Sequence, residues 1–162
     1  MSAALRARVL ALLAEHHVMT LASHGDDGPW AAAVFYAAQG LRLSFVSSPH
    51  SRHARQLERS PQVAATIQHD YADWPSIRGL QIAGRVQPVA PAELAAVREC
   101  YAQRYPLARA GGGAPEAILR AFERIRWYEL VPSDIHLIDN RLGFGHREHL
   151  RCDDDTRDDA AR

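Results

Sequence analysis

The sequence predicts a mainly β protein of the α+β type, built as a small antiparallel barrel with peripheral helices. Short segments of alternating apolar and polar residues recur along the chain, and turns rich in Gly, Pro and Asp separate them. One short helical segment follows the third of these strands. A closed or partly closed barrel is favoured because closure removes exposed strand edges.

Composition limits the number of domains and the classes of partner. A chain of 162 residues is long enough for one domain with a substantial core, which we place at residues 1–150. Residues 151–162 are charged and are predicted to be a disordered tail. The formal net charge of +0 gives no overall field that would attract nucleic acid or an acidic membrane, so neither is expected as a partner.

Cysteine usage and hydropathy predict a cytoplasmic protein. Cys100 and Cys152 lie far apart and form no metal-binding or redox spacing, which is typical of a reducing compartment. The N-terminal segment carries Arg6 and Arg8 within a helical pattern and has no long apolar run. We therefore expect neither a signal peptide nor a transmembrane span.

The first element predicted is an amphipathic helix over residues 2–16. Its apolar face is formed at helical spacing by Leu5, Val9, Leu12, Leu13 and His16. The pair His16-His17 ends this helix, and no carboxylate or cysteine completes a metal-binding spacing with it. We expect these rings to interact with the C-terminal carbonyls of the helix, and no metal site is predicted.

A hairpin follows, with strands over residues 18–23 and 30–36 and a turn over residues 24–29. The second strand contains three consecutive alanines, residues 31–33, which leave its backbone accessible. A flat ring would be able to lie against main-chain groups there. The alternative is a tightly packed strand of a small barrel, and the residues alone favour that alternative.

The central stretch of the chain runs from residue 41 to residue 61. A strand over residues 41–46 leads through a turn into a short helix over residues 52–59, which Ser51 caps. A helix N-terminus has free N–H groups and a partial positive charge, so it suits a phosphate. With the hydroxyls of Ser47 and Ser51 and the guanidinium of Arg52, this turn predicts an oxyanion cradle. The alternative is a strand–turn–helix unit that binds nothing.

The remaining elements continue the barrel and add helices. Strands are predicted over residues 62–68 and 78–86, where Gly79 and Gly84 permit bulges or sharp coiling. A helix is expected between Pro91 and Pro106, followed by a loop with three glycines and a short helix over residues 115–123. A final pair of strands, residues 126–131 and 134–139, is predicted around Pro132-Ser133.

Several short motifs, taken in order, resemble one known family. They read S-R-H-A-R-Q-L at 51–57, S-P-Q-V-A at 60–64, S-I-R-G-L-Q at 76–81, G-R-V at 84–86, Y-A-Q-R-Y-P-L-A-R at 101–109 and D-N-R-L-G-F-G at 139–145. Their order and spacing resemble the FMN-binding split barrel of the pyridoxamine 5′-phosphate oxidase-like superfamily, and in particular its YhbP-type bacterial branch. The resemblance covers roughly residues 8–150.

This resemblance implies a six-stranded antiparallel split barrel that works as a homodimer, with FMN in clefts at the subunit interface. The implied function is a flavoprotein oxidoreductase that acts on a small molecule. Simple physics agrees with this arrangement, because a barrel of this size is filled by its own side chains and leaves the cofactor outside. An apolar outer face would then be buried by a second copy.

The resemblance also implies a set of cofactor-binding residues. Ser47, Ser51, Arg52 and His53 would hold the phosphate of FMN, and Val46 would lie near the ring or the ribityl chain. The isoalloxazine would face main-chain atoms around Ala33, Val34 and Phe35. The turn Gly143-Phe144-Gly145 and Arg147 of a partner subunit would line the same cleft.

Two differences from the oxidases are expected to lower the affinity for FMN. The oxidases have Lys directly after the arginine at the helix start, where this chain has His53, which is mostly neutral at pH 7. Trp30 also stands near the start of a strand where the oxidases have a basic residue. Loss of one charge-assisted hydrogen bond costs about 1.5–3 kcal/mol, so the protein is expected to be able to purify without flavin.

Other functions stay open at the level of the sequence. The arginines that bind the substrate phosphate in true pyridoxamine-phosphate oxidases have no match, so that reaction is not expected. A non-enzymatic module that binds flavin or haem is one alternative, with His146 or His149 as a haem ligand. A deazaflavin-dependent reductase is another. Tyr36, His53 and Arg109 are the side chains singled out for a role in chemistry, with no proton donor assigned.

Overall fold

The computed structural model describes residues 3–108, 113 and 115–152. Four α-helices are present among these residues: α1 (Ala3–Glu15), α2 (Arg52–Arg59), α3 (Leu94–Arg104) and α4 (Glu116–Glu123). The strands are β1 (Val18–Gly25), β2 (Gly28–Gln39), β3 (Arg42–Ser47), β4 (Gln62–Gln68), β5 (Arg78–Pro88), β6 (Arg126–Asp139) and β7 (Arg147–Arg151). Arg109 and residues 153–162 of the predicted tail lie outside the described residues.

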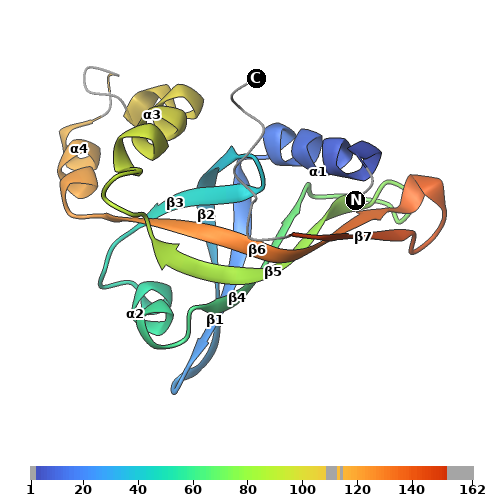
Figure 1. The fold of residues 1–162 in the computed structure, drawn as a ribbon, viewed down its shortest axis with the longest axis horizontal. Coiled ribbons are helices and arrows are strands. Elements are labelled where there is room, and N and C mark those ends of the chain that lie inside the picture. The colour runs from blue at the N-terminus through green and yellow to red at the C-terminus, as the bar shows by residue number, and fades with distance from the viewer. Residues whose placement is uncertain (1–2, 109–112, 114, 153–162) are drawn as a thin grey trace.

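Six strands close into an antiparallel barrel. The sheet has the order β3-β2-β1-β4-β5-β6-β7, and pairing of β3 with β6 closes it. Strand β6 pairs with β3 along its first part, and β7 pairs with its later part, from Asp134 to Ile138. Figure 1 shows this long strand crossing the whole molecule, with β7 beside its far end. The predicted six-stranded split barrel is confirmed, with β7 as an additional strand.

The prediction of two strands around Pro132-Ser133 is wrong, because β6 is continuous from Arg126 to Asp139. Proline has no N–H to donate, so a strand accepts it at an irregular position. Here the register of β5 against β6 shifts between Ala83 and Gly84, and Pro132 lies opposite Gly84. A Cβ on Gly84 would lie 2.4 Å from the carbonyl oxygen of Val131, so the bulge requires glycine.

Local signals set the bounds of α2 and β4 as the sequence predicts. Strand β2 is longer than predicted, because it begins at Gly28 and continues to Gln39. Helix α3 begins at Leu94, after a turn that contains Pro91. Among the described residues, no helix combines the length and apolar character that a membrane crossing would need.

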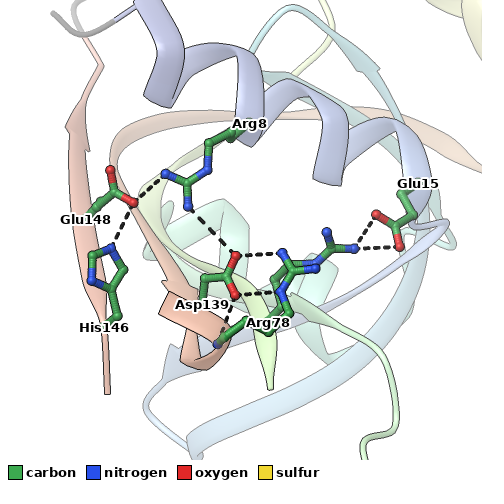
Figure 2. Close-up of polar contacts among 7 residues, drawn as sticks. Arg8, Glu15, Arg78, Asp139, His146 and Glu148 are labelled. Carbon is green, nitrogen blue, oxygen red and sulfur yellow. Dashed lines mark hydrogen bonds and ion pairs between the residues drawn. The ribbon is translucent and has the colours of Figure 1, made fainter. Parts of the chain in front are cut away.

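Helix α1 covers one end of the barrel with the apolar face that the sequence predicts. Its buried residues, Leu5, Val9, Leu12 and Leu13, join the barrel core. Polar contacts fix its other side, as Figure 2 shows: Arg8 reaches Glu148 of β7 at 2.5 Å and Asp139 at 3.8 Å, and Glu15 pairs with Arg78 of β5 at 2.7 Å.

Candidate functional site

The connection from β3 to α2 brings three of the predicted phosphate ligands together. Ser51 caps α2, and its hydroxyl accepts a hydrogen bond from the Ala54 N–H at 3.2 Å. Ser47 Oγ, at the end of β3, lies 2.9 Å from Ser51 Oγ and 2.7 Å from His53 Nε2. We call Ser47, Ser51 and His53 the hydroxyl cluster. The cluster lies at the N-terminus of α2, where free N–H groups favour an anion.

The imidazole of His53 is a neutral member of the hydroxyl cluster and contacts Ser47. Its side chain is buried, and burial lowers its pKa below the ordinary value of 6.5 because the charged imidazolium loses its hydration. A neutral ring has one donor nitrogen and one acceptor nitrogen. His53 therefore supplies a hydrogen bond to Ser47 and no charge near neutral pH.

Arg52 lies against the turn between β1 and β2. Its Nη2 donates to the carbonyl oxygen of Asp27 at 2.6 Å, and its Nε lies 2.8 Å from Asp27 Oδ2. Its guanidinium carbon lies 4.7 Å from the centre of the Trp30 ring, which is within the range of a cation–π contact. Trp30 and Asp27 therefore both contact the guanidinium of Arg52.

Gln56 is a site residue that the sequence analysis missed. Its Oε1 accepts from Ser23 Oγ at 2.7 Å, and its Nε2 donates to Asp27 Oδ1 at 2.6 Å and to the Gly28 carbonyl at 2.9 Å. The bond from Gln56 is the main cause that lowers the pKa of Asp27, with Arg52 as a further cause. Gln56 thus fastens α2 to the hairpin, and only the tertiary fold reveals these contacts.

A strand edge lies beside the hydroxyl cluster. The ladder between β2 and β3 ends at the pair Tyr36–Phe45, and Phe35 and Val46 are the next residues on the two strands. Among the described pairings, Ala33, Val34 and Phe35 are paired with β1 alone. The side chains of Ala33 and Phe35 are exposed, and that of Val34 is buried. One edge of this segment of β2, near the end of β3, therefore has no paired strand among the described residues.

Tyr36 is a core residue rather than a reactive one. Its side chain is fully buried, and its hydroxyl donates to the Leu13 carbonyl of α1 at 3.0 Å. Tyr105, at the end of α3, donates to the Tyr36 carbonyl at 2.5 Å and packs its ring edge against Phe35 at 5.4 Å. The selection of Tyr36 for a chemical role is therefore not supported, and Tyr105 is the aromatic side chain beside Phe35.

A shallow pocket of about 320 Å³ lies between α2 and the β1–β2 turn. Charged side chains line much of it, including Arg52, Arg55 and Asp27. Arg55 donates to the His50 carbonyl at 2.7 Å. Arg52 thus borders this pocket and also belongs to the turn of α2 that carries the hydroxyl cluster.

The other predicted residues lie elsewhere on the barrel. Phe144 is 80% exposed, and its ring centre lies 6.0 Å from that of Trp74. The turn before β7 that carries Phe144 lies at the opposite end of the molecule from α2 (Figure 1). His146 Nε2 lies 3.0 Å from Glu148, and His149 Nε2 lies 2.8 Å from Asp134.

The chain is similar to proteins of one family. A family model described as pyridoxamine 5′-phosphate oxidase matches residues 5–136. A UPF0306 protein of Klebsiella pneumoniae (strain 342) is 32% identical over 143 residues, which cover 87% of this chain and 89% of that protein. The UPF0306 protein YhbP of Salmonella paratyphi A is 31% identical over 139 residues, with 85% and 86% covered. These matches confirm the resemblance to the superfamily and its YhbP-type branch.

Solved structures support the same fold. A haem-binding protein from Mycobacterium smegmatis superposes with a TM-score of 0.71 at 23% identity. The superposition covers 93% of this chain but 58% of that one, so this chain spans little more than half of its length. At this level of identity the likeness shows the fold alone.

Proposed function

This chain belongs to the pyridoxamine 5′-phosphate oxidase family, and from this premise we propose that it is a homodimeric FMN-binding oxidoreductase. The observation that carries the proposal is the hydroxyl cluster at the N-terminus of α2, next to the unpaired edge of β2. When bound, FMN would supply the redox chemistry, and the chain would orient it and exclude water.

The residues present fit a phosphate group. Ser47 and Ser51 offer two hydroxyls 2.9 Å apart, and α2 adds the free N–H groups of its first turn. Arg52 contributes a cation that is already held at the same helix turn by Asp27. A phosphate would therefore meet hydroxyl donors, main-chain donors and one guanidinium, which is the kind of donor set that phosphates bind.

His53 would set the direction of the Ser47 hydroxyl. If His53 Nε2 carries the ring hydrogen, it donates to Ser47 Oγ across their 2.7 Å separation. If Ser51 also donates to Ser47 Oγ at 2.9 Å, the hydrogen of Ser47 would point at an anion in place of the Ser48 carbonyl oxygen, which lies 3.4 Å away. A histidine in place of the oxidases' lysine would thus contribute an oriented hydroxyl instead of a charge.

The isoalloxazine would lie beside β2. Within the part of the chain that the structure describes, the main chain from Ala33 to Phe35 is paired with β1 alone, and the small side chain of Ala33 permits close approach of a flat ring. Val46, half-buried on β3, is one residue beyond the last β2–β3 pair and would contact the ring or the ribityl chain. The site would then join a phosphate end at α2 to a ring end at β2.

The outer face of β1, β2 and β4 supports a homodimer. Its residues are small or apolar and lie side by side in the registers of the three strands: Val18, Thr20, Ala22, Ala31, Ala33, Phe35, Ala64 and Thr66. Val18 is 39% exposed and Phe35 is 56% exposed. A contiguous apolar face of this kind is buried most simply by a second copy through a two-fold axis.

A haem-binding module is the second candidate. The family fold is shared with a solved haem-binding protein, and His149 offers an exposed imidazole on β7. His149 stacks on His136 with ring centres 4.5 Å apart. A haem ligand at this position would have to replace Asp134 as the partner of His149 Nε2.

Absorption spectra and cofactor titration test these proposals. The protein as purified is scanned for flavin bands and for a Soret band, and FMN is then titrated into wild type, Arg52→Ala and Arg59→Ala. Arg59 is a matched control on the same helix, because it is exposed and pairs with Asp26 at 3.1 Å. We expect Arg52→Ala to weaken FMN binding about ten- to a hundredfold, and Arg59→Ala to leave it unchanged. Equal affinities of all three proteins would show that Arg52 does not bind the phosphate of FMN. A Soret band without flavin bands would favour haem as the ligand.

A further inference from the structure

Three side chains at the C-terminal end of α1 form a cluster that is not part of the proposed flavin site. Glu15, His16 and His69 each place one potential ligand atom within 4.8 Å of the other two. Glu15 and His16 lie at the end of α1, and His69 follows β4. We propose that this cluster binds a late first-row divalent transition metal such as Zn²⁺, through two imidazoles and one carboxylate.

The fold already holds His16 in an orientation that suits a metal ligand. The residue is only 4% exposed, and its Nδ1 lies 2.9 Å from the Leu12 carbonyl oxygen. A carbonyl can only accept, so Nδ1 carries the hydrogen, and Nε2 is left with its lone pair. His16 Nε2 is buried and has no hydrogen-bond partner among the described residues. Metal-binding histidines commonly donate their other ring N–H to a carbonyl oxygen in this way, which fixes the orientation of the ring.

The other two ligand atoms already have a suitable spacing. His69 Nε2 lies 3.2 Å from Glu15 Oε1, and the rings of His16 and His69 have centres 4.1 Å apart. In a tetrahedral site with metal–ligand distances of about 2.0–2.1 Å, ligand atoms are about 3.3 Å apart. The side chains of His69 and Glu15 are 51% and 41% exposed, so they are able to adjust towards the buried His16.

Arg78 would act as the outer partner of the carboxylate. Its Nη2 lies 2.8 Å from Glu15 Oε1 and 2.7 Å from Oε2, and Figure 2 shows it holding Glu15 from the side of β5. A carboxylate offers several lone pairs, so Glu15 would be able to bind a metal through Oε1 while Oε2 stays with Arg78. Three protein ligands leave a fourth position open, which is typical of sites that keep water or a small anion.

The donor set favours Zn²⁺ and its neighbours over Mg²⁺ or Ca²⁺. Imidazole nitrogens suit Zn²⁺, Co²⁺, Ni²⁺ and Cu²⁺, whereas Mg²⁺ and Ca²⁺ prefer sites made of oxygen alone. The bound metal would join the end of α1 to the segment after β4, which are separated by more than fifty residues of sequence.

Calorimetric titration of Zn²⁺ into full-length, tag-free, EDTA-treated protein tests this site. Wild type is compared with His69→Ala, whose side chain is exposed, and with His24→Ala, an exposed histidine on β1. We expect one Zn²⁺ per wild-type chain and unchanged affinity in His24→Ala. His69→Ala should bind Zn²⁺ about ten- to a hundredfold more weakly, since loss of a group that only holds a metal ligand in place already costs that much affinity.

A spectroscopic readout separates a defined site from loose association. Co²⁺ in a tetrahedral site of mixed imidazole and carboxylate ligands gives intensified visible absorption, which wild type should show and His69→Ala should lose. FMN titration of His69→Ala should match wild type, because the cluster is separate from the hydroxyl cluster. Equal Zn²⁺ affinity of wild type and His69→Ala, or the absence of Zn²⁺ binding by wild type, would overturn the proposal whatever the outcome at the flavin site.

Discussion

Asp27 and Arg52 form an ion pair that joins the β1–β2 turn to the first turn of α2, with Arg52 Nε 2.8 Å from Asp27 Oδ2. The arginine that would bind the FMN phosphate is therefore already engaged by a carboxylate of its own chain. Binding of the phosphate would have to share or replace this pair. The Asp27 carboxylate thus positions the Arg52 guanidinium and also competes with the phosphate for it.

The first prediction follows from this competition. Asp27→Asn removes the negative charge but keeps an oxygen for Gln56 and the main-chain carbonyl for Arg52. FMN affinity, measured by quenching of flavin fluorescence, should rise about two- to fivefold. Asp26→Asn is the matched control in the same turn, because Asp26 pairs with Arg59 instead. Unchanged or weaker binding by Asp27→Asn would show that the ion pair does not compete with phosphate.

The second prediction concerns the dimer. Phe35→Lys places a charge within the apolar outer face of β1, β2 and β4, opposite Val18. Burial of that unpaired charge in a two-fold contact would be costly, so sedimentation velocity should show monomers where wild type shows dimers. Trp74→Lys changes an aromatic residue that is even more exposed and lies outside this face, so it should keep the wild-type state. Dimeric Phe35→Lys would place the interface elsewhere.

The third prediction is a pH dependence of stability that depends on His53. Burial lowers the pKa of His53 in the folded protein below 6.5, so between these two values the unfolded chain binds more protons than the folded one. The free energy of unfolding should therefore fall as the pH falls below about 6.5 and approach its full value above it.

Urea denaturation of wild type and His53→Gln between about pH 5 and about pH 8 measures this effect. Glutamine keeps a hydrogen-bonding side chain near Ser47 but does not titrate. The difference in unfolding free energy between the two proteins should shrink as the pH falls. A difference that stays constant with pH would contradict the assignment of a buried, neutral histidine.

The fourth prediction concerns the bulge opposite Pro132. Gly84→Ala would place a Cβ 2.4 Å from the Val131 carbonyl oxygen and 2.9 Å from Pro132 Cα, and both are main-chain atoms. The bulge would have to shift, at a cost of about 1–3 kcal/mol in unfolding free energy. Ala83→Ser, at the neighbouring exposed position, should change stability little. Denaturant unfolding checks both, and a neutral Gly84→Ala would show that the bulge is pliable.

Much of the fold is predictable from the sequence because its signals are local. Ser51 and Ser60-Pro61 set the limits of α2, and alternation sets β4. The continuity of β6 is not predictable in this way, since Pro132 is accommodated only by a bulge in a different strand, at Gly84. Strand β7 is missed because a short edge strand needs its partner to be recognised.

The candidate site likewise has one part that the local sequence predicts and another that only the tertiary structure reveals. Ser47, Ser51 and His53 lie within seven residues of sequence, so the strand–turn–helix pattern is sufficient to bring them together. The roles of Asp27 and Gln56 depend on the packing of α2 against the β1–β2 hairpin. The cluster of Glu15, His16 and His69 likewise depends on tertiary structure, and the local spacing around His16-His17 gives no sign of it.

The pairing of β3 with β6 has a consequence for biosynthesis. The contact that closes the barrel includes the Arg42–Glu129 ion pair, whose partners are 87 residues apart. Ordering of the intervening chain must precede any gain from this pairing, which slows folding of such topologies. A nascent chain on the ribosome would expose the free edges of β3 and β5 until β6 emerges, and that interval is when the protein most needs protection from aggregation.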